Sequence, residues 1–337
     1  MCGQPEDRIV TSRLQRVGRS AGVKPRVLLV DDHKGVLDKV SSTLSDTFDV
    51  VGVATDGRQA LEMARHLDPD AIVLDINMPG FNGFETMRAL ERTGSRAAVV
   101  FLSLIHDDDY VCEAFRLGGR GYVVKSRMLS DLPTALDQAL LGRRFAPSLP
   151  ALLQISSGGT HAMLAHDDED SFVDAVGPLL DLALHRGDAT GLIGTEHIRD
   201  GVTAYLQARG WDVGPSGTLR RYRVFDTHAA LDGLMRDGLP DATRLAAIVE
   251  ELDEYRRTVC TGPSSRITIA GNLAAPLMAE GNAAGVLAIE RLWDTLTKGR
   301  PFFSVCGYST SCFHDHTSDG WSTLTNEHSA VCLGSGV

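Results

Sequence analysis

The sequence predicts an α/β protein of two domains, of which the first is a doubly wound parallel sheet of five strands. Five short apolar runs alternate with segments whose apolar residues recur at helical spacing, and the runs lie at residues 26–30, 48–53, 71–74, 97–102 and 121–124. Apolar strands that alternate with helices are typical of a parallel sheet covered on both faces, with right-handed crossovers. The length of 337 residues is also enough for two domains.

Domain boundaries follow from breaks in these patterns. Residues 1–22 form a basic stretch without periodicity, which predicts a disordered tail, and residues 24–142 hold the first domain. Residues 143–157, in which two prolines are followed by serines and glycines, are predicted to be a linker. A second α/β domain is predicted at 158–333. Its strands are expected at 189–193, 222–225, 266–270 and 302–305, and its helices at 172–185, 198–208, 245–258 and 283–296.

Composition and charge argue against several classes of protein. The net charge of −11 argues against non-specific binding to nucleic acid, which needs clustered lysine and arginine. No apolar run approaches the roughly 20 residues that span a bilayer, and the N-terminus lacks the apolar core of a signal peptide. The six cysteines are scattered without the spacing of a disulfide framework, so we expect reduced thiols and a cytoplasmic location. Neither a membrane nor DNA is an expected direct partner.

Five polar residues follow the apolar runs of the first domain, at the points where strands end. They are Asp31, Asp32, Asp75, Ser103 and Lys125. Open parallel sheets bind ligands at the carboxyl ends of their strands, so we expect these side chains to converge. Three carboxylates at close range need a cation, and oxygen ligands of this kind suit Mg2+. A lone aspartate at a strand end is usually a turn residue or a helix N-cap, whereas the whole set in this order indicates a reaction centre.

Such a centre supports the transfer of a phosphoryl group to a carboxylate. Asp75 is the predicted nucleophile, which would form a covalent aspartyl phosphate. The metal ion and Lys125 would neutralise charge on the phosphoryl oxygens, and Ser103 would hydrogen-bond the new phosphoryl group. The sequence therefore predicts a phosphoacceptor at Asp75 and Mg2+ as its cofactor.

Residues 26–142 resemble the receiver domain of bacterial response regulators, which has a flavodoxin-like fold. The motifs that carry the resemblance are VLLVDDH, VLDINMPGFNGFE, FLS and GYVVKS. The resemblance implies that Asp32 and Asp75 bind Mg2+ directly, that Asp31 binds it through a water molecule, and that Asn77 contributes its backbone carbonyl.

The same resemblance implies a conformational switch. Tyr122 matches the aromatic switch position, and it would fill the space that Ser103 vacates when it turns toward a phosphorylated Asp75. The alternative is that Tyr122 is an ordinary half-buried strand residue. Ser126 stands where many receivers have a proline after the lysine, which puts the geometry of this loop in question. The implied phosphate source is a sensor histidine kinase or a small phosphodonor, and the implied homodimer surface is helix four, strand five and helix five of the receiver.

Residues 158–333 resemble the MEDS sensory domain of methanogens and methylotrophs, a KaiC-like or RecA-like fold without nucleotide machinery. The matching motifs are HAML, LLDLALHRGDATGLI, AIERLWDTL, PFFSVCGY and EHSAVC. The chain contains no GxxxxGK[ST] phosphate loop. It also shows no basic helix-turn-helix, although residues 118–148 resemble the receivers that precede one. We interpret this domain as a binding module for a small-molecule ligand or a protein partner, rather than as an enzyme or a DNA-binding domain.

Two sets of residues in the second domain are candidates for ligand or metal binding. His161 opens the HAML motif, and Glu290 and Trp293 share one face of a predicted helix, where Glu290 either contacts a ligand or forms a surface ion pair. Thiols and imidazoles near the C-terminus are candidates for a Zn2+ or redox-metal site or for thiol redox sensing; they are Cys306, Cys312, His314, His316, His328 and Cys332. The spacing lacks a CxxC pair, and the alternative is that Cys306 is a small apolar strand residue.

The sequence therefore predicts a two-component response regulator that is phosphorylated on Asp75 with Mg2+ and carries a MEDS-like binding domain without a separate catalytic output. Two alternatives stay open. The receiver is attached to a catalytic or metal-binding output domain, or it serves as a phosphorylation-independent scaffold.

Overall fold

The structure is a computed structural model that describes residues 23–156, 158–214, 216–262, 264–313 and 319–334. The predicted tail, 1–22, lies outside these residues. The chain divides into two compact units, Met1–Pro147 and Ser148–Val337, which are described separately below. Among the described residues, no helix is both long enough and apolar enough to cross a membrane.

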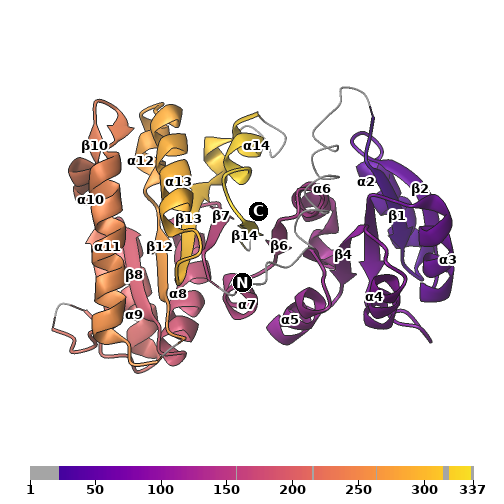
Figure 1. Ribbon diagram of the computed structural model, residues 1–337, viewed down its shortest axis with the longest axis horizontal. Coiled ribbons are helices and arrows are strands. Elements are labelled where there is room, and N and C mark those ends of the chain that lie inside the picture. The colour runs from indigo at the N-terminus through magenta and orange to yellow at the C-terminus, as the bar shows by residue number, and fades with distance from the viewer. Residues whose placement is uncertain (1–22, 157, 215, 263, 314–318, 335–337) are drawn as a thin grey trace, which may run out of the picture. The chain divides into compact units, whose positions relative to one another are not determined.

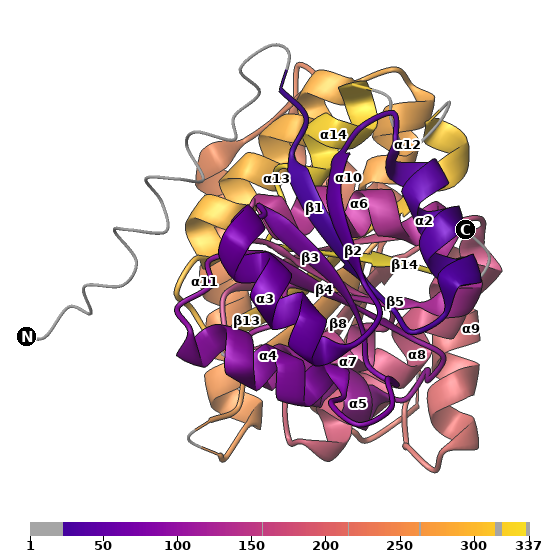
Figure 2. The same ribbon diagram turned by 90° about the vertical axis from the view of Figure 1, so that its right-hand side faces the viewer.

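The first unit is a parallel sheet in the order β2-β1-β3-β4-β5-β6. Its strands are β1 (Arg26–Val30), β2 (Asp49–Ala54), β3 (Ala71–Asp75), β4 (Ala98–Ser103), β5 (Gly121–Val124) and β6 (Arg144–Ala146). Its helices are α2 (Lys34–Leu44), α3 (Gly57–Leu67), α4 (Gly83–Arg92), α5 (Asp108–Arg116) and α6 (Met128–Leu140), with a 3-10 turn η1 (Lys125–Arg127). Figure 2 looks onto this unit, where β2, β1, β3 and β4 run side by side. The predicted doubly wound sheet is confirmed, and β6 adds a short sixth strand.

The order of the strands determines where the polar strand ends meet. Strand β1 lies between β2 and β3, so the chain winds away from β1 in both directions and leaves a crevice at this point. Every residue of β3 is buried, because helices cover both faces of the sheet. Helices α2 and α6 pack together on one face, and α3 packs against α4 on the other.

The second unit is also a fully parallel sheet, in the order β14-β7-β13-β12-β8-β9 (Figure 1). Its strands are β7 (Thr160–His166), β8 (Ala189–Gly194), β9 (Tyr222–Asp226), β12 (Ile267–Gly271), β13 (Phe302–Ser309) and β14 (Ala330–Leu333). Its helices are α7 (Leu149–Ile155), α8 (Glu169–His185), α9 (Glu196–Ala208), α10 (Thr227–Leu234), α11 (Ala242–Val259), α12 (Ala274–Ala279), α13 (Ala283–Thr297) and α14 (Asp319–Thr325), with a second 3-10 turn η2 (Thr310–Cys312). A small antiparallel ladder joins β10 (Met235–Arg236) to β11 (Leu239–Pro240).

Every strand and helix that the sequence predicts in the second unit is present, but several further elements were not predicted, among them the helices α10, α12 and α14. Strands β7 and β14, which pair with each other, were not predicted. The segment predicted as a linker, 143–157, contains β6 in the first unit and α7 in the second. Ser148 caps α7 by accepting a hydrogen bond from the Ala151 amide, and a proline follows in the first turn, a common way to begin a helix.

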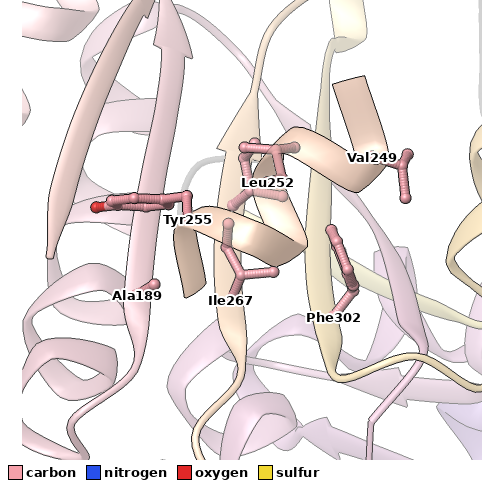
Figure 3. Close-up of a cluster of buried hydrophobic side chains, with 7 residues drawn as sticks. Ala189, Val249, Leu252, Tyr255, Ile267 and Phe302 are labelled. Carbon is pink, nitrogen blue, oxygen red and sulfur yellow. The ribbon is translucent and has the colours of Figure 1, made fainter. Parts of the chain in front are cut away.

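The core of the second unit lies where α11 covers the sheet (Figure 3). Ile267 of β12 and Phe302 of β13 are fully buried beneath Leu252 and Tyr255 of α11. The hydroxyl of Tyr255 donates a hydrogen bond of 2.9 Å to the carbonyl oxygen of Arg220, so the one polar atom of this ring is satisfied. This packing fixes α11 and the neighbouring α13 over β12 and β13.

Candidate functional site

The structure brings the predicted acidic pocket of the first unit together. Asp31 follows β1 and Asp75 ends β3, and both side chains are buried. The Nζ atom of Lys125, from the end of β5, lies 2.7 Å from Oδ2 of Asp31 and 3.0 Å from Oδ2 of Asp75. One ammonium group therefore bridges two carboxylates that come from different strands.

Burial and charge set the protonation of this pocket. Burial raises the pKa of Asp75, and the hydrogen bond from Lys125 opposes that rise. Burial acts to lower the pKa of Lys125, but the hydrogen bonds to Asp31 and Asp75 outweigh it, and the pKa is raised. The lysine therefore remains a cation, as a group that binds phosphoryl oxygens needs to be.

The remaining ligands predicted for Mg2+ line an open hollow next to the pocket. Asp32 is half-buried, and its Oδ1 lies 2.9 Å from Nδ1 of His33, a neighbour that the sequence analysis did not single out. Asp32 and Asn77 line a hollow of about 800 Å³. Three carboxylates against one lysine leave excess negative charge, and hard oxygen donors suit Mg2+, so these residues fit the ion. Asp32, Asp75 and the carbonyl of Asn77 are the groups that would hold it.

Close packing shapes the turn after Asp75. The amide of Gly83 donates a hydrogen bond of 3.0 Å to the carbonyl oxygen of Ile76. A Cβ atom on Gly83 would lie 2.3 Å from the carbonyl oxygen of Asp75, closer than any real side chain approaches. Glycine is therefore required for α4 to begin this close to the end of β3.

Ser103 and Tyr122 are both tied to the loop that follows β4. The buried Ser103 accepts a hydrogen bond of 3.1 Å from the amide of Ile105. Tyr122 is completely buried, and its hydroxyl donates a hydrogen bond of 2.7 Å to the carbonyl oxygen of the same residue. Burial raises the pKa of Tyr122, so this hydroxyl stays a donor. The peptide bond between Lys125 and Ser126 is trans.

In the second unit, the structure assembles a cluster that differs from the predicted one. Cys306 of β13 lies with His161 of β7, Glu290 of α13 and His328, and the donor atoms of the four residues are all within 4.8 Å of one another. Nε2 of His161 is 2.9 Å from Oε2 of Glu290 and 3.2 Å from Sγ of Cys306. Nε2 of His328 is 3.3 Å from the same carboxylate oxygen.

The other predicted cysteine and histidine candidates do not join this cluster in the described part of the chain. Cys332 is buried in β14, with Sγ directed at the carbonyl oxygen of Leu333 at 4.0 Å. His314 and His316 lie outside the described residues, as does the side chain of Cys312. Of the predicted candidates, Cys306 and His328 therefore lie together with His161 and Glu290, which come from distant parts of the sequence.

Tyr308 and the histidines control the charge of Glu290. The Tyr308 hydroxyl donates a hydrogen bond to Oε1 of Glu290, a contact that the sequence analysis missed. Burial acts to raise the pKa of Glu290, but the charge of His328 and the hydrogen bond from His161 hold it well below its usual range. Glu290 is therefore a buried carboxylate, and the surface ion pair considered for it does not apply.

An apolar cavity of about 260 Å³ adjoins this cluster. Glu290 and Cys306 form part of its wall, together with Trp293, whose Nε1 donates a hydrogen bond of 2.9 Å to Oγ of Ser304. Most of the remaining wall is hydrophobic and includes Ile193, Phe225, Leu252, Ile269 and Ile289. Glu290 and Trp293, predicted to share a helix face, thus face the same cavity. A partly open, mostly apolar space with a few polar groups is the usual form of a small-molecule site.

The segment that joins β7 to α8 and begins that helix is acidic. It reads Asp167, Asp168, Glu169 and Asp170. Asp168 caps α8 by accepting a hydrogen bond of 2.8 Å from the amide of Ser171. The start of this helix is therefore occupied by a carboxylate, in a position where phosphate-binding proteins have a glycine-rich loop.

Comparison with known proteins agrees with this division. Residues 27–137 match the family model of the response regulator receiver domain, and residues 160–322 match that of MEDS, the methanogen/methylotroph, DcmR sensory domain. The first unit is 37% identical over 141 residues to the nitrate/nitrite response regulator protein NarL of Escherichia coli, covering 40% of this chain and 65% of that protein. It is 33% identical over 135 residues to the response regulator GacA of Pseudomonas aeruginosa, covering 39% and 63%. The chain thus spans a little under two thirds of these relatives.

Two solved structures are similar to about a third of this chain. The signal receiver domain of NarL from Mycobacterium tuberculosis is 30% identical, with 36% of this chain and all of that chain covered and a TM-score of 0.35. The chemotaxis protein CheY4 of Vibrio cholerae is 30% identical, with 35% and 99% covered and a TM-score of 0.33.

Proposed function

Because the chain joins a response regulator receiver domain to a MEDS domain, we propose that it is a response regulator of a two-component system that is phosphorylated on Asp75 in a Mg2+-dependent reaction. The observation that carries the proposal is the bridge from Lys125 to Asp31 and Asp75. A sensor histidine kinase or a small phosphodonor would supply the phosphoryl group. The chain itself would have no separate catalytic output.

The pocket accounts for each part of this transfer. A carboxylate oxygen of Asp75 attacks the phosphorus atom, an O–P bond forms, and the bond between phosphorus and the donor's nitrogen or oxygen breaks with its electron pair leaving on the donor. Lys125, already within 3.0 Å of Asp75, neutralises the phosphoryl oxygens as charge develops. Bound Mg2+ would neutralise further charge on the same oxygens.

The link to the rest of the receiver runs through Ile105. Ser103 bonds the amide of Ile105 and Tyr122 bonds its carbonyl. A phosphoryl group on Asp75 adds roughly −1.5 to −2 charges and attracts the Ser103 hydroxyl. Ser103 must give up its bond to Ile105 to respond, so the loop after β4 is released and Tyr122 is free to move.

The surface next to this loop supports a homodimer. Leu104, Tyr110 and Leu129 are large hydrophobic side chains that are 41 to 72% exposed on the loop after β4, on α5 and on α6. Large apolar side chains that stay exposed in the monomer are often found at protein contact sites. We propose that phosphorylation promotes pairing through this face, and sedimentation of the wild type with and without phosphodonor tests it.

For the MEDS domain we propose binding of a small, largely apolar molecule or a protein partner, not DNA. The apolar cavity next to Glu290 and Trp293 supports the small-molecule form. We place the protein in the cytoplasm, because the four cysteines whose side chains are described, Cys112, Cys260, Cys306 and Cys332, are free thiols.

Intact mass spectrometry after incubation with acetyl phosphate and Mg2+ tests the receiver. The wild type should gain the mass of one phosphoryl group, and the Asp75→Asn variant should gain none. The Asp49→Asn variant is the matched control, because Asp49 is an exposed residue at the start of β2, and it should be phosphorylated like the wild type. Phosphorylation of Asp75→Asn, or of the wild type in excess EDTA, would contradict the proposal.

Binding of benzene as a probe tests the cavity. Apolar cavities lined by aliphatic and aromatic side chains take up such molecules. We expect benzene to raise the midpoint of thermal unfolding of the wild type, but not that of Ala274→Leu, which fills part of the cavity wall. An equal shift in both proteins would show that the cavity is not the binding site.

A further inference from the structure

The cluster of His161, Glu290, Cys306 and His328 contains buried polar atoms without hydrogen-bond partners among the described residues. Nδ1 of His328 lies 2.8 Å from the carbonyl oxygen of Leu324 and donates its hydrogen there, so Nε2 is the ring nitrogen directed into the cluster. Nε2 lies 3.3 Å from Oε2 of Glu290, and the two atoms do not form a hydrogen bond of sound geometry with each other. Both residues are at least 97% buried, so water does not relieve this contact. A cation bound between these two atoms would satisfy both of them.

The four donors are those of a transition-metal site. Cysteine sulfur, histidine nitrogen and glutamate oxygen are all Zn2+ ligands, with bonds of about 2.0 to 2.3 Å. Tetrahedral geometry then separates the ligand atoms by about 3.3 to 3.6 Å. The observed separations of 2.9 Å for His161 to Glu290 and 3.2 Å for His161 to Cys306 are a few tenths of an ångström shorter, and that of 3.3 Å for His328 to Glu290 lies within this range. Small outward shifts would therefore accommodate an ion.

Neighbouring groups orient these donors as metal sites require. Metal-binding histidines usually donate their second nitrogen to a carbonyl or carboxylate, as Nδ1 of His328 does to Leu324. The Tyr308 hydroxyl holds Oε1 of Glu290, which leaves Oε2 directed at the two histidines. Ser329 hydrogen-bonds both the amide and the carbonyl of His161, which fixes the backbone of that ligand beside β14.

We propose that His161, Glu290, Cys306 and His328 bind one tetrahedral divalent transition-metal ion of the Zn2+ type. The ion occupies the space between Nε2 of both histidines, Oε2 of Glu290 and Sγ of Cys306. Its charge balances the carboxylate and a thiolate in a buried place. Glu290 and Cys306 also line the apolar cavity, so a molecule in that cavity lies directly against two of the metal ligands.

Metal analysis of the purified full chain gives the first test. After removal of loosely bound metal, elemental analysis should find one equivalent of Zn2+ per chain. Replacing it with Co2+ should give the intense near-ultraviolet band of a thiolate-to-metal charge transfer and the visible bands of tetrahedral Co2+. Absence of both stoichiometric metal and a Co2+ thiolate band in a folded protein overturns the proposal, and the four residues then form a proton-sharing network.

Variants assign the ligands. Cys306→Ser should lose the charge-transfer band, and His328→Gln should lower Co2+ affinity at least 100-fold. Cys332→Ser is the matched control, because Cys332 is a buried cysteine of β14, a strand that pairs with β7, and its Co2+ spectrum should equal that of the wild type. Unchanged metal binding in Cys306→Ser together with loss in Cys332→Ser would overturn the assignment.

A milder variant covers the case in which ligand substitutions unfold the unit. Tyr308→Phe keeps every ligand and removes only the hydroxyl that holds Glu290, so metal affinity should fall by about 10- to 100-fold with the fold retained. Unaltered affinity in folded Tyr308→Phe counts against Glu290 as a ligand. The Asp75→Asn variant should bind the metal like the wild type, which separates this site from the receiver pocket.

Discussion

The hydroxyl of Tyr122 donates a hydrogen bond of 2.7 Å to the carbonyl oxygen of Ile105, and the whole ring is buried. The tyrosine therefore points into the first unit rather than toward solvent. Its bond holds the loop that also binds Ser103, so a residue at the middle of β5 restrains the loop after β4. Movement of this ring outward costs one buried hydrogen bond.

The Tyr122→Phe variant tests the energy of this bond. It leaves the carbonyl of Ile105 without its partner, so the free energy of unfolding of the first unit should fall by about 0.5–1.5 kcal/mol in urea denaturation. Tyr110→Phe is the control, because the Tyr110 ring is 41% exposed, and its change should stay within about 0.5 kcal/mol. Equal losses in the two variants would show that the buried bond contributes nothing specific.

Removal of the Lys125 charge should destabilise the acidic pocket. The thermal stability of the first unit should then depend more strongly on a bound divalent cation. In Lys125→Met, Asp31 and Asp75 lose the ammonium group that lies within 3.0 Å of both, at a cost of about 3 kcal/mol without metal. Thermal unfolding with EDTA and with Mg2+ measures the effect. The rise in midpoint on adding Mg2+ should be larger for Lys125→Met than for the wild type or for Lys39→Met, an exposed lysine of α2. A smaller rise would count against a shared cation site.

Truncation in the core beneath α11 should destabilise the second unit. Ile267 is fully buried between Leu252, Tyr255 and Phe302, so Ile267→Ala leaves a cavity and should lower the free energy of unfolding by about 2–5 kcal/mol. Urea denaturation followed by circular dichroism measures this change. Val224→Ala on β9 removes a side chain that is 38% exposed, and its cost should remain below about 1 kcal/mol.

His166 should make the second unit less stable in mild acid. Its ring is buried against Phe172, and burial lowers its pKa in the folded protein. The unfolded chain therefore binds a proton near pH 6.5 that the folded chain does not, so stability falls as the pH drops below about 6.5 and levels off once the folded-state pKa is passed. His166→Gln should reduce this loss of stability at low pH, the acid limb of the stability profile. The measurement is the free energy of unfolding from urea denaturation at pH 5.5 and 7.5.

His197 supplies a comparison of opposite sign. Its imidazole lies 2.6 Å from Asp170, whose hydrogen bond raises the pKa of His197. Any stabilisation from this exposed pair is present at low pH and disappears as the pH rises through the folded-state pKa. His197→Gln should therefore steepen the acid limb slightly or leave it unchanged. If His197→Gln reduced the loss of stability at low pH as much as His166→Gln does, that loss could not be assigned to His166.

The receiver pocket could be predicted from the sequence because its residues follow apolar strands of the same sheet. Asp75 comes directly after four apolar residues, and parallel pairing of β1 with β3 carries it to Asp31. The hydrogen bonds of Ser103 and Tyr122 to Ile105 could not be predicted, because they depend on the path of an irregular loop.

The cluster of the second unit could be predicted only in part. All four residues were candidates, but in two separate sets. Strand β7 has a histidine near each end and no apolar alternation, so it was not identified as a strand. Strand β14 has only four residues, too few to give a periodic signal. Without these two strands, nothing in the sequence places His328 next to His161.

The position of β14 in the chain has a consequence for the order of folding. His161, Glu290 and Cys306 are translated before His328, which precedes β14, and β14 pairs with β7 near the start of the unit. During synthesis the cluster therefore remains incomplete until the last strand has docked. The four-residue cluster is thus complete only in a second unit whose first and last strands have paired. A ribosome-bound chain that stops before residue 328 lacks the complete cluster.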